Sequence, residues 1–189
     1  MIFREVEDRD LIARTRRGDV EAYNLLVSRW EKRVFNYLLR LVNHREDAMD
    51  VAQEVFLKAY QNLPKLDDAD RFSAWLFRIA HNEAYSLLRR RKPEGEMPAE
   101  AAVFGGASSI TSSMMPMETT MAVRKAIKSL SEDHREAVLL KVYQGFKFEE
   151  MAEILGCPVS TVKSRVYAGL EQLKLVLAPA AAHVTKERA

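Results

Sequence analysis

The sequence predicts an all-α protein with two small helical domains joined by a flexible linker. Apolar residues recur every three or four positions along most of the chain, whereas the alternation expected of half-buried strands is almost absent. Residues 93–118 interrupt this pattern with prolines, glycines and serines and contain no basic residue. We therefore expect a first domain at residues 1–92, a linker at 93–118, a second domain at 119–177 and a C-terminal tail at 178–189.

Four helices are expected in the first domain. The first covers about residues 8–17 and ends at Gly18, and Asp19 is a candidate N-cap for the second helix. The second helix carries an apolar stripe of Ala22, Leu25, Leu26, Trp30, Val34, Leu38 and Leu41. The third covers about residues 45–62, ends at Pro64 and is expected to bury Ala48, Val51, Ala52, Val55 and Ala59. The fourth covers about residues 72–91 and is expected to bury Trp75, Leu76, Ile79, Ala80, Leu87 and Leu88.

The second domain is expected to hold four more helices. A helix at about residues 119–129 is followed by one that Ser131 caps and that ends near Gly145. A short helix at 149–155, a tight turn at 156–158 and a longer helix at 159–177 follow. The last helix has an inward stripe of Val162, Val166, Leu170 and Leu173. The alanine- and proline-containing tail beyond it is expected to fray.

The final two helices form a candidate helix-turn-helix. Gly156 allows the left-handed backbone of a sharp turn, Pro158 suits the first turn of the next helix, and Ala152 is small where the two helices would cross. The outward face of the last helix carries Ser160, Thr161, Lys163, Ser164 and Tyr167. Hydroxyls, a cation and a ring suit a helix in the DNA major groove. The alternative is an ordinary helical hairpin with a solvated face.

Two helices of the first domain carry polar faces of different character. One face of the fourth helix suits unpaired DNA bases and consists of Arg78, His81, Asn82, Tyr85, Ser86 and Arg89. The alternative is a solvated face with a cationic end that the helix dipole favours. The third helix sets acidic and amide side chains outward beside apolar ones: Asp47, Asp50, Gln53, Glu54, Phe56, Leu57 and Tyr60. This mixture indicates a docking surface for a basic protein partner.

Several classes of protein are disfavoured by composition and motif. Net charge is only +2, so a nucleic-acid partner has to be inferred from the placement of charge. No nucleophile–base pair, metal-ligand spacing or phosphate loop is visible, so we expect no enzyme activity, no cofactor, no metal and no small-molecule substrate. With a single cysteine, no signal peptide and no apolar run of roughly 20 residues, the chain is expected to be cytoplasmic without membrane insertion.

The residues of both domains resemble a known family. Residues 18–26 (GDVEAYNLL), 47–60 (DAMDVAQEVFLKAY) and 72–82 (FSAWLFRIAHN) are similar to sigma region 2. Residues 129–138 (SLSEDHREAV) and the helix-turn-helix are similar to sigma region 4. Together, in this order and across a linker, they resemble the extracytoplasmic-function (ECF) RNA polymerase sigma factors, closest to the sigma-E branch.

The resemblance implies a sigma factor that binds core polymerase, recognises −10 and −35 promoter elements and is controlled by an anti-sigma factor. The clamp helices of the largest polymerase subunit would bind Asp47, Asp50, Gln53, Glu54, Phe56 and Leu57, and the flap would be a further contact. The −10 element would be recognised by the loop at residues 66–71 and by Arg71, Arg78, His81, Asn82, Tyr85, Ser86 and Arg89, with Asn82 at the family position that contacts a flipped base. The −35 element would be read by Ser160, Thr161, Lys163, Ser164, Arg165 and Tyr167. The linker would thread toward the RNA exit path.

Three features depart from the family pattern. Lys147 replaces a capping serine or threonine, which predicts a weaker helix start. Ala168 and Gly169 replace a cation on the reading helix, and His81 and Glu83 flank Asn82, so the resemblance alone does not give the promoter preference. Two other functions fit parts of the pattern: a regulator that binds duplex DNA without polymerase, and a helical signalling or scaffold protein. Binding to duplex DNA unaided would mark the first, and retention on DNA that is insensitive to salt would mark the second.

Overall fold

A computed structural model describes the backbone of residues 6–91 and 117–186, and the side chains of residues 6–91 and 121–178. Every regular element within these ranges is helical, which confirms the predicted all-α class. The chain divides into two compact units, Met1–Ala102 and Val103–Ala189. Of the predicted linker, only Met117 and Glu118 fall within the described residues, and both belong to a helix. The domain boundaries remain a prediction.

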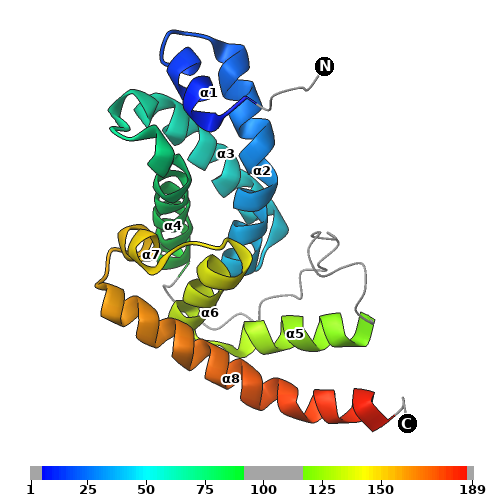
Figure 1. The fold of residues 1–189 in the computed structure, drawn as a ribbon. Coiled ribbons are helices and arrows are strands. Elements are labelled where there is room, and N and C mark those ends of the chain that lie inside the picture. Colours follow the sequence, from blue (N-terminus) through cyan, green and yellow to red (C-terminus); the bar gives the residue numbers. More distant parts are fainter. Residues whose placement is uncertain (1–5, 92–116, 187–189) are drawn as a thin grey trace, which may run out of the picture. The chain divides into compact units, whose positions relative to one another are not determined.

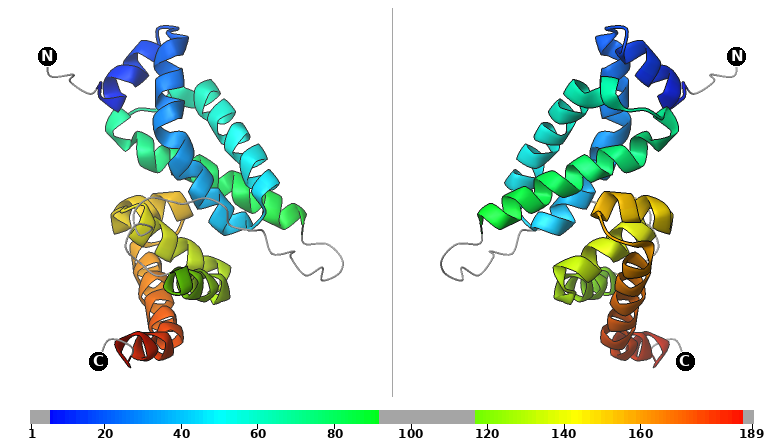
Figure 2. Two further views of the ribbon diagram at one scale, coloured as in Figure 1. Left: turned by 90° about the vertical axis from the view of Figure 1, so that its right-hand side faces the viewer. Right: turned by 90° about the vertical axis from the view of Figure 1, so that its left-hand side faces the viewer.

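The first unit is a bundle built around one long helix (Figure 1). Its elements are α1 (Asp8–Thr15), α2 (Val20–Val42), α3 (Arg45–Asn62), the short 3-10 helices η1 (Leu63–Lys65) and η2 (Ala69–Arg71), and α4 (Phe72–Arg90). Helix α2 packs against α1, α3 and α4, and α3 packs against α4, as the two side views in Figure 2 also show. Tyr37 of α2 and Phe77 of α4 are fully buried at the centre, with their ring centroids 5.1 Å apart.

The start of α2 follows the sequence prediction. The Asp19 side chain accepts a hydrogen bond from Ala22 N at 3.1 Å and so caps the helix. The predicted stripe is buried with one exception, because Leu25 is 51% exposed. Leu25 precedes buried Leu26 by one residue, which rotates it by about 100° out of the stripe.

The burial predicted for α4 was wrong at several positions. The residues that α4 buries are Phe72, Ala74, Leu76, Phe77, Ala80 and Ala84. Residues predicted to be buried but only half-buried are Trp75, Ile79, Leu87 and Leu88, together with Ala52 of α3. The small alanines let α4 approach its neighbours closely, which turns the larger Trp75 and Ile79 toward the edge of the bundle.

The second unit contains α5 (Met117–Ser129), α6 (Glu132–Val138), the π-helical segment η3 (Leu139–Tyr143), α7 (Phe148–Leu155) and α8 (Val159–Lys186). Helix α8 packs against α5, α6 and α7 (Figure 1). The Ser131 side chain caps α6 as predicted, by accepting from His134 N at 3.3 Å. Helix α8 continues to Lys186 rather than ending at Leu177, in keeping with the high helix propensity of its alanines.

Gly169 lies where α8 crosses α6. A Cβ atom at this position would lie 2.7 Å from Val138 Cγ2 and 3.2 Å from the His134 carbonyl oxygen, so the crossing requires glycine. Gly169 takes the inward position between the buried Val166 and the half-buried Leu173, and the predicted inward residue Leu170 is instead 39% exposed. Gly169 is therefore a packing residue of the second unit.

None of the helices in the described part of the chain is both long enough and apolar enough to cross a membrane.

Candidate nucleic-acid interface

A pocket of about 370 Å³ lies between the end of α3 and the face of α4. Its lining residues are Lys58, Asn62, Lys65, Trp75, Arg78, Ile79, Asn82 and Glu83. Trp75 and Ile79 supply apolar surface, and Asn82 supplies an amide. Three of the lining side chains are cations and one is an acid. The Asn62 amide is already bonded within the wall, to the Lys58 carbonyl oxygen at 2.9 Å and to Lys65 Nζ at 3.0 Å. This combination suits a planar, polar group that is attached to an anion.

Lys58 ties the two helices together at this pocket. Its Nζ lies 2.7 Å from Glu83 Oε2 on α4 and 3.4 Å from Glu54 Oε1 on α3. The hydrogen bond to Glu83, aided by Glu54, raises the pKa of Lys58 above its ordinary value. The Glu83 carboxylate, with only 16% of its side chain exposed, therefore has a cation beside it in the pocket wall.

The predicted −10 residues on α4 share one helix face, because their positions repeat every three or four residues. Arg78 and Asn82 line the pocket, and the His81 and Tyr85 rings are in contact, with centroids 4.5 Å apart and planes tilted by 41°. Farther along the helix, Arg89 Nε donates to the Tyr85 carbonyl oxygen at 3.4 Å. Half-buried Ser86 lies on the same face, whereas Arg71 precedes the helix in η2.

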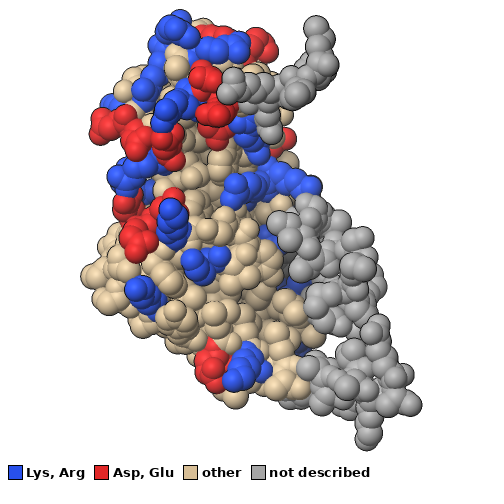
Figure 3. Space-filling view, in the orientation of Figure 1, with Lys and Arg blue, Asp and Glu red and all other residues tan. Residues whose placement is uncertain are grey.

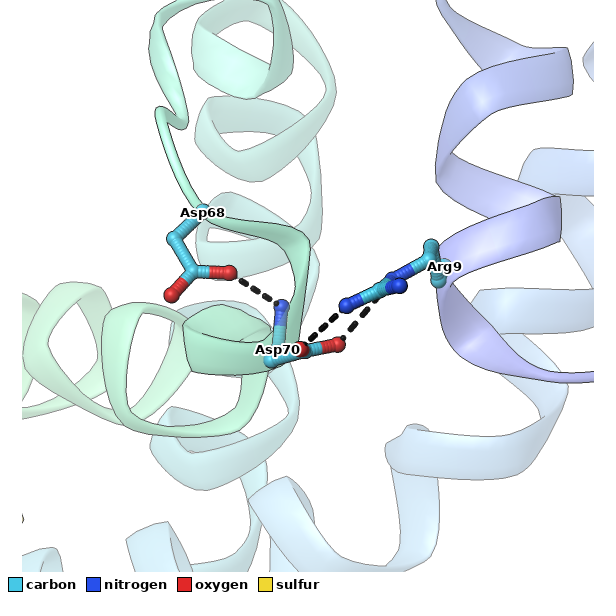
Figure 4. Close-up of polar contacts among 3 residues, drawn as sticks. All are labelled: Arg9, Asp68 and Asp70. Carbon is cyan, nitrogen blue, oxygen red and sulfur yellow. Dashed lines mark hydrogen bonds and ion pairs between the residues drawn. The ribbon is translucent and has the colours of Figure 1, made fainter.

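Helix α1 contacts the segment that connects α3 to α4. Arg9 donates to both carboxylate oxygens of Asp70, with Nε 3.2 Å from Oδ1, and Asp68 Oδ1 accepts from Asp70 N at 2.9 Å (Figure 4). The Asp70 hydrogen bond and charge raise the pKa of Arg9. Arg16 donates to the carbonyl oxygens of Leu63 and Leu66.

The predicted polymerase-binding face of α3 is mostly exposed. Its solvent-facing members are Asp50, Gln53, Glu54 and Leu57. Half-buried Asp47 forms an ion pair with Arg91, and its Oδ2 lies 3.1 Å from His44 Nδ1. Half-buried Phe56 stands on the flank, and its carbonyl oxygen accepts from the Tyr23 hydroxyl at 2.5 Å. The structure thus groups four of the six residues on an open acidic surface.

In the second unit, the start of α8 presents most of the predicted −35 residues outward. Ser160, Lys163, Ser164 and Tyr167 are exposed, and half-buried Thr161 accepts from Ser164 Oγ through its carbonyl oxygen at 2.9 Å. Gly156 has φ +62°, which confirms the predicted left-handed turn before this helix. On the side drawn in Figure 3, this unit shows a few separate cations on a largely uncharged surface.

Arg165 does not join that group. Its side chain is about one quarter exposed, and Nη2 lies 2.8 Å from Asp133 Oδ2 at the start of α6. Its Nη1 also lies 4.0 Å from Cys157 Sγ in the turn. Arg165 therefore links α8 to α6 and to the turn, beside the exposed face rather than on it.

Phe148, the first residue of α7, was not singled out from the sequence. Its ring centroid lies 5.5 Å from Lys163 Nζ, 4.5 Å from Lys141 Nζ and 6.3 Å from the Tyr167 ring centroid. The ring therefore supports two residues of the predicted reading face. The sequence feature that could have pointed to Phe148 is its position as an aromatic residue directly before the acidic pair Glu149 and Glu150.

The start of α7 is capped in spite of Lys147. The Glu150 carboxylate accepts from Lys147 N at 2.7 Å, so an acid three residues on supplies the cap that the lysine side chain lacks. This hydrogen bond satisfies the Lys147 backbone amide, so it compensates for the missing serine or threonine cap that predicted a weaker helix start.

The pocket also contains residues that sequence reasoning missed. Lys58, Asn62 and Lys65 come from the end of α3 and from η1, and Trp75 was assigned to the core. The four-residue spacing of Lys58 and Asn62, beside that of Arg78 and Asn82, could have indicated two facing polar edges. No group of acidic, histidine or cysteine side chains in the described part of the chain is arranged to hold a metal ion.

Comparison with known proteins assigns both units. Residues 26–94 match the Sigma-70 region 2 family, and residues 120–173 match the Sigma-70, region 4 family. The chain is 34% identical over 183 residues to the RNA polymerase sigma-H factor of Pseudomonas aeruginosa, covering 92% of this chain and 95% of that protein. It is 38% identical over 179 residues to the ECF RNA polymerase sigma-E factor of Escherichia coli K12, covering 89% and 93%.

Two solved structures are similar over most of the chain. One is the sigma factor RpoE of Bartonella quintana in complex with the anti-sigma factor NepR, with TM-score 0.65 and 26% identity over 82% of this chain and 96% of that one. The other is CnrH in complex with the cytosolic domain of CnrY, with TM-score 0.65 and 26% identity over 91% and 97%. With both sigma regions matched in order and curated relatives aligned over nearly their full length, the chain belongs to the extracytoplasmic-function RNA polymerase sigma factors and is sigma-E-like.

Proposed function

We propose that this protein directs promoter-specific transcription initiation by docking on core RNA polymerase and presenting α4 to the −10 element and α8 to the −35 element. The observation that supports this division of roles is the pocket beside Asn82, because it combines apolar, amide and cationic surfaces on a helix whose last turn is basic. Such a pocket suits an unpaired base and its phosphate, not the edge of an intact duplex.

At the −10 element, the Trp75 and Ile79 surfaces accept the base and the Asn82 amide hydrogen-bonds to its edge. Arg78 and Lys65 lie close enough in the lining to neutralise neighbouring phosphates. Extruding a base costs a few kcal/mol in unstacking, so this site acts by capturing bases once the duplex opens. The contacting rings of His81 and Tyr85 extend the same face along α4.

At the −35 element, the first turns of α8 lie in the major groove. Ser160, Lys163, Ser164 and Tyr167 are exposed there, and Lys163 is the cation of the group. The Phe148 ring beneath Lys163 and Tyr167 limits the orientations that these two side chains adopt. Arg165 supports the helix through Asp133 and contributes less to reading.

Docking on polymerase makes this DNA binding conditional. The acidic face of α3 is complementary to a basic partner, for which the clamp helices of the largest subunit are the candidate, with the flap as a second contact. Each unit by itself offers few cations to DNA, so the free protein binds promoters weakly. Fixing both units on one polymerase raises the effective concentration of each for its element.

An anti-sigma factor is the expected regulator. Two structures with the same fold are complexes of a sigma factor with an anti-sigma factor, NepR in one case and the cytosolic domain of CnrY in the other. A protein that covers the acidic surface of α3 would prevent polymerase docking. The protein acts in the cytoplasm, carries no catalytic chemistry of its own and requires neither cofactor nor small-molecule substrate.

Run-off transcription with purified core polymerase on a randomised promoter library tests the proposal. The expected result is RNA from a minority of templates that share two motifs at a fixed spacing, and no RNA without the protein. Failure of core polymerase to retain the protein, or absence of RNA from every template, would contradict it. Tight binding of the free protein to duplex DNA would instead favour a regulator that acts without polymerase.

A further inference from the structure

Arg9 of α1 and Arg16, the residue directly after α1, contact the two ends of the segment that joins α3 to α4. We propose that Arg9 and Arg16 position residues 63–71 for the −10 strand, so that α1 controls promoter selectivity from outside the reading face. This inference rests on the proposed function of the pocket beside Asn82. It assigns Arg9 and Arg16 as positioning residues, because neither is among the side chains that line the pocket.

Arg16 holds the first end of the segment. Its Nε and Nη2 both lie 3.3 Å from the Leu63 carbonyl oxygen, and Nη2 also donates to the Leu66 carbonyl oxygen. The Leu63 carbonyl oxygen also accepts from Leu66 N at 3.2 Å at the end of η1, so Arg16 adds to a turn that the backbone already closes. Lys65, which lines the pocket, lies between Leu63 and Leu66 in the chain. The Arg16 guanidinium therefore bonds to the backbone on both sides of a pocket residue.

Arg9 holds the second end. It pairs with both oxygens of Asp70, and the Asp68 side chain closes the same turn by accepting from Asp70 N (Figure 4). Two residues later, Phe72 begins α4 and is 2% exposed, with its ring centroid 5.9 Å from that of Trp75 in the pocket wall. The Arg9–Asp70 pair thus holds the turn from which the pocket side of α4 starts.

The exposure of the Arg9–Asp70 pair indicates a role in positioning and not in folding. The Arg9 and Asp70 side chains are 61% and 63% exposed, and an exposed ion pair contributes little to global stability. The core of the unit depends instead on buried side chains such as Tyr37 and Phe77. Removing the pair is therefore expected to loosen residues 63–71 while the bundle stays folded.

The test uses the full-length protein with core polymerase and a fluorescent single strand carrying a −10 sequence selected by the wild-type protein. The variants are Arg9→Asp, Asp70→Arg, the double charge reversal, Arg16→Gln and Arg16→Lys, with Arg17→Gln as the matched control from the same arginine-rich stretch. Affinity is measured for the selected strand and for strands with one −10 base changed. Thermal unfolding and retention by core polymerase are measured alongside.

We expect each single charge reversal and Arg16→Gln to weaken binding of the selected strand by about fivefold or more and to reduce its preference over the altered strands. The double reversal restores most of both quantities, Arg16→Lys is intermediate, and Arg17→Gln matches the wild type. Unfolding temperature and polymerase retention stay within the control range. A purely structural role would lower the unfolding temperature and would leave the base preference unchanged.

Two results would count against this inference in different ways. Single reversals that bind and discriminate like the wild type, or a double reversal no better than either single change, would overturn the role of α1 and leave the pocket assignment intact. A wild-type complex that binds no single strand at all would overturn the pocket assignment, and the role of α1 with it.

Discussion

Lys58 of α3 and Glu83 of α4 form an ion pair across the wall of the proposed base pocket, with Nζ 2.7 Å from Oε2. The pair connects the helix expected to dock on polymerase with the helix expected to hold the −10 strand. It also keeps a carboxylate beside Asn82 from facing DNA phosphates as an unpaired charge.

We expect Lys58→Met to weaken binding of the −10 single strand to the polymerase complex by about tenfold, because Glu83 would then repel phosphate. The double variant Lys58→Met/Glu83→Gln should bind better than Lys58→Met alone, since the repelling charge is gone. Fluorescence anisotropy measures both, with the exposed Lys32→Met of α2 as control. Equal affinity of the single and double variants would show that the Glu83 charge is not the cause.

Asn82→Ala should impair promoter opening more than promoter binding. The amide contributes to the pocket and can act only on a base that has left the duplex. Opening is followed through the fluorescence of 2-aminopurine placed in the −10 element, and binding through retention of the labelled duplex promoter by the polymerase complex. Asn24→Ala, at an exposed position of α2, serves as control. An equal loss in both measurements would place Asn82 in duplex recognition.

Lys163→Ala and Arg165→Ala should have different consequences although the two cations are neighbours. Lys163 is exposed, so its loss should weaken −35 binding and reduce the salt dependence by about one counterion. Arg165 is paired with Asp133, so its loss should mainly lower the unfolding temperature of the second unit. Salt titrations of DNA binding and thermal unfolding separate the two, with exposed Lys174→Ala as control. A larger salt effect for Arg165→Ala than for Lys163→Ala would reverse the assignment.

Gly169→Ala should destabilise the second unit by about 1–3 kcal/mol through overpacking against α6. Alanine would ordinarily stabilise a helix relative to glycine, so the sign of the change is informative. The new methyl would lie 2.7 Å from Val138 Cγ2 and 3.2 Å from a backbone oxygen, which leaves little room for relaxation. Thermal unfolding by circular dichroism measures the change against the exposed Ser164→Ala. An unchanged or higher unfolding temperature would mean that the crossing adapts.

Asp19→Asn should remove a pH-dependent part of the stability of the first unit. Hydrogen bonding from Ala22 N, followed by Arg14, lowers the pKa of Asp19 below its ordinary value of 3.8. A lowered pKa in the folded state means that this contribution is present above that value and is lost as the pH falls through the folded pKa. The wild type should therefore unfold a few degrees higher than the variant at pH 7, with the difference shrinking below about pH 3.8. A difference that is constant from pH 7 to pH 2 would exclude the carboxylate charge as its cause.

Most helix boundaries were more predictable from the sequence than the environment of single residues, although α8 continues to Lys186, beyond its predicted end at residue 177. The predicted third helix, residues 45–62, coincides with α3, and Pro64 was the signal for its end. Periodicity also placed the polar α4 residues on one face. It could not show that Trp75 borders a pocket, because a large apolar side chain satisfies the same spacing in a core or in a pocket wall.

Ion-pair partners were beyond sequence reasoning for a similar reason. Arg165 shares the reading helix with Lys163, and only the packing of α6 against α8 reveals that Asp133 engages it. The contacts of Arg9 and Arg16 with residues 63–71 join positions about 50 to 60 apart in the chain. Local pattern carries no information about such long-range pairs.

The close helix crossing at Gly169 separates the packing edge of α8 from its proposed reading edge. The crossing fixes the height and rotation of α8 on the side opposite the proposed reading face, from which Ser160, Lys163, Ser164 and Tyr167 project. Under the proposed function, new side chains at those four outward positions alter the preferred −35 sequence without moving α8. Substitution at Gly169 would shift all four at once, so the inner edge of this helix in this protein tolerates less change than the outer edge.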